Sequence, residues 1–290
     1  WDLANGPDYN IFIDKIKEES FVSDFNKIVS QHSIADKKPA ISLSSGIDSN
    51  IVMNNFLTMN KKYLSFTLGF KNKTFDESRH IKGHHNNIDK KIYYADEQLI
   101  KSSFLEISKV FNDPIGDSSL VPTYIIQKKI KDYTNVSLGG DGGDESFFGY
   151  ITFDAFYLAR IFKKIIPLSV LNILKKMIKS FKVSSDYITF KTKVIKFFSS
   201  IDLEEKYLLP SWMACLDKNN LKILFNEKED SNSFYTEMDS LFSKKNNFMR
   251  IAQIYHFKFY LPMILSKIDQ AGMFNSVESR SPLLSKKIIN

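Results

Sequence analysis

Short apolar runs rich in isoleucine, valine and phenylalanine alternate with stretches of helical spacing in the first half of the chain. The runs that are expected to form strands are residues 40–43, 63–68, 91–94 and 135–138. The helices between them are expected to begin near Ser49, Asp76 and Pro122. Strands that alternate with helices are typical of parallel β-α-β units. The pattern therefore predicts an α/β fold with a Rossmann-like parallel sheet in residues 36–150.

Helical spacing continues on both sides of this region. In residues 161–178 apolar residues recur at helical spacing with lysines between them, and strand signals fade there. Residues 9–30 have the same spacing, which indicates one or two helices packed at the edge of the sheet. We therefore expect one domain over residues 11–290 whose second half, residues 151–290, is helical.

The composition is that of a globular protein. With 290 residues, 43% of them hydrophobic, the chain is long enough to bury a core, and wholly disordered and collagen-like classes are excluded. The longest nearly apolar run, residues 165–174, contains Pro167 and is far shorter than the roughly 20 residues that span a bilayer. A single cysteine, Cys215, permits no internal disulfide, so we expect a cytoplasmic protein. The sequence begins with Trp1, and we expect that upstream residues have been removed.

Positive charge is concentrated in one segment. The formal net charge is +7, but residues 160–196 alone carry ten basic residues and one acid, a net charge of +9, which leaves −2 for the rest of the chain. Such a segment suits a solvated helical face, a contact with an anionic membrane surface or a nucleic-acid patch. Few aromatic residues stand among its lysines to stack on bases, so we expect no nucleic-acid partner.

The first candidate site is a strand that runs through small residues into a helix, Ile41-Ser42-Leu43-Ser44-Ser45-Gly46-Ile47-Asp48-Ser49. A helix N-terminus presents unpaired N–H groups, and small residues let phosphate oxygens approach them. Asp48 would repel phosphate unless a divalent cation lay between them, which implies Mg²⁺. A simpler interpretation is a β-α turn in which Asp48 and Ser49 cap the helix. The segment is not a Walker loop, which ends in Gly-Lys-Ser/Thr.

The second candidate site is Gly139-Gly140-Asp141-Gly142-Gly143-Asp144-Glu145, which follows the run at residues 135–138. Its glycines allow close approach of the backbone to a ligand, and its acids offer carboxylates to a cation. The alternatives are a flexible loop and a calcium loop, although the acids of an EF-hand are absent. Because both motifs follow strands of a parallel sheet, we expect a nucleotide site at its carboxyl edge.

These two motifs resemble those of the asparagine synthetase type of ATP pyrophosphatase. The family's Ser-Gly-Gly-x-Asp-Ser loop stands here as residues 44–49, with Ser45 at the second position, and its Gly-(Glu/Asp)-Gly-x-Asp-Glu motif stands as residues 140–145. Further similar segments, in the family's order, are Phe66–Phe70, Phe75–Ser78, Asp113–Ser119, Pro122–Tyr124 and Val277–Leu284.

The resemblance implies a PP-loop sheet of the adenine nucleotide α-hydrolase type and ATP-dependent amide formation. In that reaction a carboxylate forms an acyl-adenylate with release of pyrophosphate, and ammonia or an amine then displaces AMP. The ligands implied are ATP and Mg²⁺, with Asp48, Asp141 and Asp144 as catalytic residues and Asp48 and Asp144 as metal ligands. The residues implied to bind the nucleotide are Ser42, Leu43, Ser44, Ser45, Gly46, Ser49, Leu68 and Gly140, with Leu68 meeting the adenine through its backbone.

Two segments of the family have no counterpart in this sequence. Complete members begin with a glutamine-hydrolysing domain that has an N-terminal cysteine, so we expect this chain to make no amide from glutamine by itself. A glutaminase domain or subunit is a possible partner. Members also carry a lysine well beyond the Pro-Leu-Leu position, and the sequence ends at Asn290 before it, which indicates a truncated chain or a second polypeptide.

Other functions of the same scaffold stay open at this point. Relatives close lactam rings or macrocyclise peptides with an internal amine, and no residue here separates those reactions from aspartate amidation. A tRNA-thiolating enzyme would suit the positive charge, but such enzymes use cysteines or a sulfur carrier. A non-catalytic scaffold is disfavoured by the presence of Ser44, Asp48 and Asp144, whereas the missing lysine leaves it open.

Simpler roles account for several other polar residues. Surface or packing positions are expected for three histidines without a further metal ligand, His80, His84 and His85. A role at the start of a helix, rather than contact with substrate, is expected for Asp76 and Glu77. Buried structural ion pairs are expected for Lys258, Lys267, Asp269 and Arg280, with contact to the acceptor carboxylate as the alternative for Arg280.

Overall fold

The computed structural model describes residues 18–58, 63–71, 76–81, 88–111, 115–179, 190–213, 238–242 and 247–289. The chain divides into two compact units. The sheet unit contains residues 9–147 and 259–290, and the helical unit contains residues 1–8 and 148–258. Cys215, His84 and His85 lie outside the described residues.

A parallel sheet of five strands runs through the described part of the sheet unit, in the order β3-β2-β1-β4-β5. The strands are β1 (Ala40–Ser42), β2 (Tyr63–Phe70), β3 (Ile88–Ala95), β4 (Val136–Leu138) and β5 (Glu278–Arg280). In the register, Ala40 of β1 lies opposite Leu64 on one side and Ser137 on the other. The predicted α/β fold with a parallel sheet is therefore confirmed, and β1 to β4 coincide with the four predicted runs.

The fifth strand lies in residues 151–290, the half in which the sequence predicts helices and in which strand signals fade. Its three residues are glutamate, serine and arginine, and they are half-buried or exposed. Because none of them is apolar, no hydrophobic alternation signals a strand. Pairing with β4, in which Val136 lies opposite Glu278, holds this segment in the sheet.

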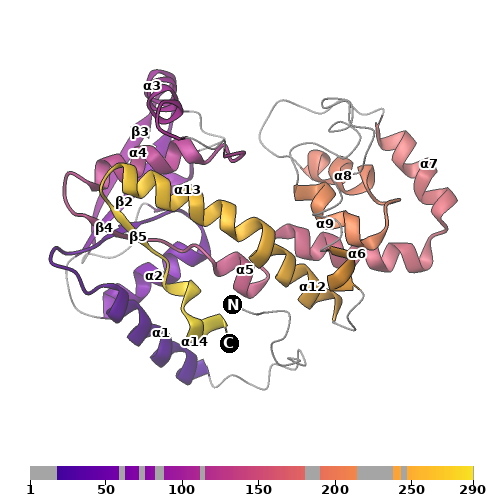
Figure 1. The fold of residues 1–290 in the computed structure, drawn as a ribbon, viewed down its shortest axis with the longest axis horizontal. Helices are drawn as coiled ribbons and strands as arrows, with labels where there is room; N and C mark the ends of the chain where they lie inside the picture. Colours follow the sequence, from indigo (N-terminus) through magenta and orange to yellow (C-terminus); the bar gives the residue numbers. More distant parts are fainter. Residues whose placement is uncertain are drawn as a thin grey trace. The chain divides into compact units, whose positions relative to one another are not determined.

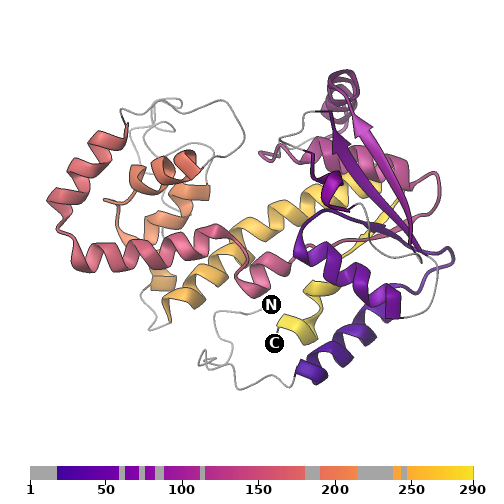
Figure 2. The ribbon, with the colours of Figure 1, turned by 180° about the vertical axis from the view of Figure 1, so that it is seen from behind.

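Helices cover both faces of the sheet (Figure 1, and from behind in Figure 2). One face of the sheet is covered by α1 (Glu18–His32) and α2 (Ile47–Thr58). The other face is covered by α4 (Leu120–Ile130) and α13 (Leu261–Phe274). Successive residues of β1 point to opposite faces, so Ile41 packs with α1 and α2 while Ala40 packs with α4. Helix α3 (Glu97–Ser108) packs on α4 as an outer element.

The starts of the helices follow local chemistry. α2 begins at Ile47 and α4 at Leu120, close to the predicted starts. The helix expected near Asp76 is instead a short 3₁₀ turn, η1 (Glu77–Ile81), in its described part, because the Asp76 carboxylate accepts hydrogen bonds from the N–H and the hydroxyl of Ser78 and tightens the chain there. Helix α3 was not among the predicted elements; the side chain of Asp96 caps its N-terminus by accepting from Leu99 N at 2.8 Å.

Helices and the turns between them, with no strand, make up the described part of the helical unit. The helices include α6 (Ile151–Ile165), α7 (Leu168–Lys179), α8 (Phe190–Ser199), α9 (Glu205–Met213) and α12 (Phe248–Tyr255), and residues 238–242 are also helical. Pro167 separates α6 from α7, as expected of a residue that cannot continue a helix. His256 is fully buried beside Thr152, and burial lowers its pKa to about 4.

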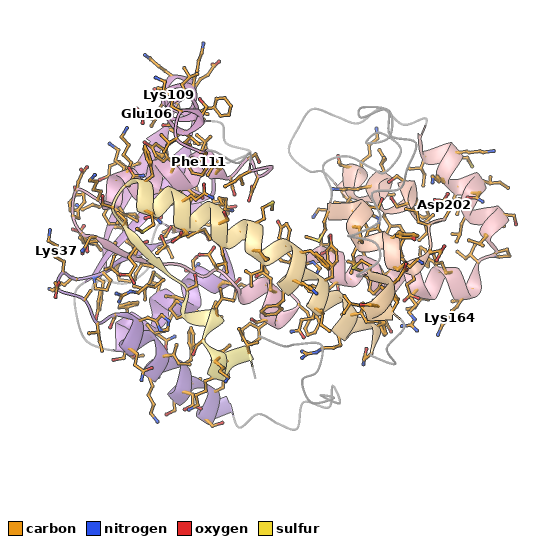
Figure 3. All side chains as sticks on the ribbon, viewed as in Figure 1. Lys37, Glu106, Lys109, Phe111, Lys164 and Asp202 are labelled. Atoms are coloured by element: carbon orange, nitrogen blue, oxygen red, sulfur yellow. The ribbon has the colours of Figure 1, made fainter. Side chains whose placement is uncertain are left out.

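The basic segment at residues 160–196 has two kinds of lysine. Lys163 donates to the carbonyl of Leu203 and Lys175 pairs with Asp202, so these two lysines tie α6 and α7 to the turn between α8 and α9. Lys164 is exposed, and the side chains of Lys164 and Asp202 are labelled on this unit in Figure 3. Contact with an anionic membrane surface stays a prediction. Within the described ranges, we find no helix with the length and apolar character needed to cross a bilayer.

Phe66 provides a test of the hydrophobic core between the sheet and α4. Its side chain is 0% exposed and packs with Ala40, Ile126 and Ile130, so Phe66→Ala is expected to lower the free energy of unfolding by about 3–5 kcal/mol through lost burial and a residual cavity. The matched control is Phe104→Ala on α3, where the side chain is 58% exposed and a change within about 0.5 kcal/mol is expected. Urea unfolding followed by circular dichroism measures both; equal losses would contradict the buried position of Phe66.

Candidate functional site

The first motif leaves the sheet at the carboxyl end of β1. Ser42 is the last residue of β1, and Leu43 stays attached to β2 because its N–H donates to Phe66 O at 2.9 Å and its carbonyl accepts from the hydroxyl of Thr67 at 2.8 Å. The Leu43 side chain is buried in the core. The chain then turns through Ser44, Ser45 and Gly46 into α2. Anchoring at Leu43 therefore sets where this turn begins.

The turn at residues 44–46, here called the serine turn, is held by its own hydroxyl groups. Ser44 N donates to Ser49 Oγ at 3.1 Å, Gly46 N donates to Ser44 Oγ at 3.1 Å, and the two hydroxyl oxygens lie 3.0 Å apart. Asn50 donates through Nδ2 to the carbonyls of Ser44 and Gly46. These bonds fix the shape of the turn at the N-terminus of α2, the end of a helix at which N–H groups can bind anions.

The second motif packs directly on the first. At Gly140 a Cβ atom would lie 2.6 Å from the carbonyl carbon and 2.8 Å from the Cβ of Asp48, and at Gly143 it would overlap the Asp48 carboxylate. Gly142 has φ +89° and lies under the Leu284 side chain. The chain then enters the short helix α5 (Gly143–Phe147). The two motifs thus meet at the carboxyl edge of β1 and β4, and glycine is required at that contact.

Three acids are brought together where the motifs meet. The pKa of Asp48 is raised to about 6, first by burial and then by the negative charges of Asp144 and Asp141, although the N–H of Asp144 donates to its carboxylate. Burial also raises the pKa values of Asp141 and Asp144. In the described part of the chain, no three His, Cys, Asp or Glu side chains form a group suited to hold a metal ion by themselves. The three acids nevertheless crowd negative charge at this edge of the sheet.

Leu68 lies near the carboxyl end of β2. Its side chain packs in the cluster of Ala40 and Phe66. Phe66 O accepts a hydrogen bond from Leu43 N, so the backbone groups of Phe66 point toward β1. Every second residue of a strand directs its backbone groups to the same neighbouring strand, so the N–H and C=O of Leu68 point in the direction of β1 as well. Leu68 stands two residues beyond Phe66, which is paired with Ser42 at the end of β1. The peptide groups of Leu68 thus lie at the same carboxyl edge of the sheet as the serine turn.

The structure places two further side chains near this edge that the sequence interpretation did not assign to it. Glu77 accepts hydrogen bonds from Ser45, from the N–H at 3.3 Å and from the hydroxyl at 2.8 Å. Lys267 of α13 is buried and donates to Asp117 Oδ2 and Ser119 Oγ, each at 2.7 Å. The ammonium of Lys267 also lowers the pKa of Asp141, although burial outweighs it. Glu77 and Asp117 both lie in segments that carry the family resemblance, which was the available signal.

Lys267 makes the buried ion pair that the sequence predicts for it, since the side chains of Lys267 and Asp117 are only 9% and 17% exposed. The ion pair of Arg280 is not buried in the predicted way, because the side chain of its partner Glu278 is 59% exposed. The guanidinium of Arg280 donates to Glu278 and to the carbonyls of His32 and Ile34. It therefore ties β5 to the end of α1. Contact of Arg280 with an acceptor carboxylate stays a prediction.

Comparison with known proteins agrees with this geometry. The sequence profile described as asparagine synthase matches residues 21–290. A Methanocaldococcus jannaschii protein, named as a candidate glutamine-hydrolysing asparagine synthetase 2, is 34% identical over 167 residues, which are 52% of this chain and 30% of that protein. A Mycobacterium tuberculosis protein, also named as a candidate glutamine-hydrolysing asparagine synthetase, is 24% identical over 296 residues, 95% of this chain and 42% of that protein.

A third relative is the glutamine-hydrolysing asparagine synthetase 1 of Bacillus subtilis. It is 23% identical over 273 residues, which cover 90% of this chain and 41% of the relative. The chain thus spans less than half the length of these relatives.

The crowding of the acids can be tested directly. Asp144→Asn removes one of the charges that raise the pKa of Asp48, so that pKa is expected to fall below about 6 while burial keeps it above its ordinary value. Carboxyl-carbon NMR titration of Asp48 measures the change, and Asp154→Asn on α6, an exposed acid of the helical unit, is the matched control. An unchanged pKa of Asp48 in Asp144→Asn would show that the two carboxylates do not interact.

Proposed function

The chain belongs to the asparagine synthase family, and on this premise we propose that it activates a carboxylate with ATP and transfers the acyl group to ammonia or an amine. The proposed substrate is a small-molecule carboxylate, with aspartate as the first candidate. Free ammonia or a glutaminase domain or subunit supplies the nitrogen. The observation that carries the proposal is the direct contact between the serine turn's helix and the acid-bearing loop at residues 140–144.

The proposed reaction has two steps. A carboxylate oxygen attacks the α-phosphorus of ATP, the bond from that phosphorus to the bridging oxygen breaks, and pyrophosphate leaves. The nitrogen of ammonia or an amine then attacks the acyl carbon, AMP leaves with the former carboxylate oxygen, and the nitrogen loses a proton. Neither step uses a covalent bond to the protein, so the residues contribute positioning and charge compensation.

The start of α2 is proposed to bind the phosphate groups. Helix N-termini carry a partial positive charge and unpaired N–H groups. The hydroxyls of Ser44 and Ser49, which bond to each other at 3.0 Å, can rotate and donate to phosphate oxygens instead. Gly140 lets the second loop approach that turn, and the peptide groups of Leu68 are proposed to contact the adenine edge.

The acid pair suits Mg²⁺. This ion is usually bound by one or two carboxylates together with substrate phosphates and waters. Asp48 in the first turn of α2 and Asp144 in the first turn of α5 supply two carboxylates. Burial and mutual repulsion raise the pKa of Asp48 to about 6, so a cation is the natural compensation for its charge. When bound, Mg²⁺ neutralises the triphosphate and the leaving pyrophosphate. Asp141 belongs to the proposed catalytic set because its charge also acts on Asp48.

Asp48→Asn tests the proposed function. Exchange of labelled pyrophosphate into ATP, with aspartate as the carboxylate probe, is expected to fall at least about 100-fold because charge compensation at the phosphates is lost. The folded state binds the Asp48 proton more tightly than the unfolded chain does, so its ionisation destabilises the fold as pH rises from about 4 to about 6. At pH 7 the variant is therefore expected to be no less stable than the wild type.

The control for this experiment is Asp154→Asn, which makes the same change at an exposed position and is expected to retain exchange. Thermal unfolding of each variant separates loss of chemistry from loss of fold. Full exchange in Asp48→Asn, with intact folding, would refute the assignment of this acid.

A further inference from the structure

The carboxylate of Glu77 accepts hydrogen bonds from Ser45 of the serine turn. Its Oε2 accepts from Ser45 N at 3.3 Å and from Ser45 Oγ at 2.8 Å. Both residues are exposed to solvent. An anionic group of the protein thus lies on the turn that is proposed to hold anionic phosphates.

The three N–H groups of the serine turn differ in the kind of acceptor they meet. Ser44 N and Gly46 N donate to the hydroxyls of Ser49 and Ser44. A hydroxyl can rotate and donate to an arriving phosphate, so it can change from acceptor to ligand. The N–H of Ser45 donates to Glu77. An ionised carboxylate has no proton to donate, and it repels a phosphate that approaches the same N–H.

The backbone that carries Glu77 is anchored by the preceding residue. The carboxylate of buried Asp76 accepts from Ser78 N at 3.1 Å and from Phe70 N at 3.4 Å, and it lies 3.4 Å from Arg79 Nε. Its hydrogen bonds with Ser78, above all, lower the pKa of Asp76. Phe70 is the last residue of β2, so η1 starts at a defined place at the carboxyl edge of the sheet. The Glu77 side chain therefore reaches Ser45 from an ordered support.

We infer that Glu77 is a further residue of the nucleotide site, which competes with ligand phosphates for Ser45 and so sets how tightly polyphosphates are held. The inference rests on the proposed function. Because the bonded groups are exposed, the contact is weak enough for a polyphosphate to displace it. In the proposed reaction the carboxylate regains Ser45 as pyrophosphate leaves, which assists release of that product.

Glu77→Gln tests this inference. Glutamine keeps the length of the side chain and removes the negative charge. The variant is expected to bind inorganic pyrophosphate about threefold to tenfold more tightly than the wild type, the range expected for loss of one exposed repulsive charge. Isothermal titration calorimetry with pyrophosphate and excess Mg²⁺, at constant ionic strength, measures the affinity, and ATP serves as the second probe.

Two further variants separate a local effect from a general one. Glu97→Gln makes the same change in net charge at an exposed position in the first turn of α3 and is expected to leave the affinity unchanged. Ser45→Ala removes the hydroxyl that donates to Glu77 at 2.8 Å. In that background Glu77→Gln is expected to give a smaller gain, since part of the competition is already gone.

The outcomes distinguish the inference from the proposed function. Tighter binding in Glu77→Gln, unchanged binding in Glu97→Gln and a smaller gain in the Ser45→Ala background support competition at Ser45. If the wild type binds pyrophosphate and Glu77→Gln binds it equally or more weakly, Glu77 positions the turn or shares a cation with the phosphates, and the inference is overturned alone. If neither protein binds pyrophosphate or ATP, the proposed function fails and the inference fails with it.

Discussion

The fit of a glycine backbone against the first turn of α2 is the constraint on which the rest of the candidate site depends. Parallel pairing places Ala40 opposite Ser137, so β1 and β4 end together and their following loops meet. At Gly140 the meeting is so close that a methyl group would collide with the backbone of Asp48. The distance between the two motifs is thus determined by the main chain, and the acids are brought together as a consequence.

Because the two motifs lie so close together, the candidate site combines hydrogen-bond donors with negative charge. The serine turn presents hydrogen-bond donors at a helix N-terminus, whereas Asp48, Asp141 and Asp144 crowd negative charge beside it. Lys267 offsets part of that charge, but its hydrogen bonds are directed to Asp117 and Ser119. An anion that carries a divalent cation matches both properties, because the anion can accept from the donors and the cation can offset the charge of the acids. A bare anion or a bare cation matches only one of them.

Sequence reasoning could predict the features that depend on neighbouring residues. The apolar runs marked β1 to β4, and the serine and glycine motifs marked the loops that follow β1 and β4. It could not predict β5, because Glu278, Ser279 and Arg280 lack apolar alternation and form a strand only through their partner. The contact of Glu77 with Ser45 and that of Lys267 with Asp117, 150 residues apart, arise from tertiary packing. The sequence pattern around each residue therefore does not predict such contacts.

The division of the sheet unit into two sequence segments affects the order of folding. Residues 259–290 supply β5, α13 and the Leu284 side chain over Gly142, while most of the sheet comes from residues before 148. During synthesis the first segment leaves the ribosome with one edge of β4 still unpaired, and residues 148–258 must emerge before that edge is covered. During this interval the nascent sheet therefore exposes a strand edge that can pair with other chains.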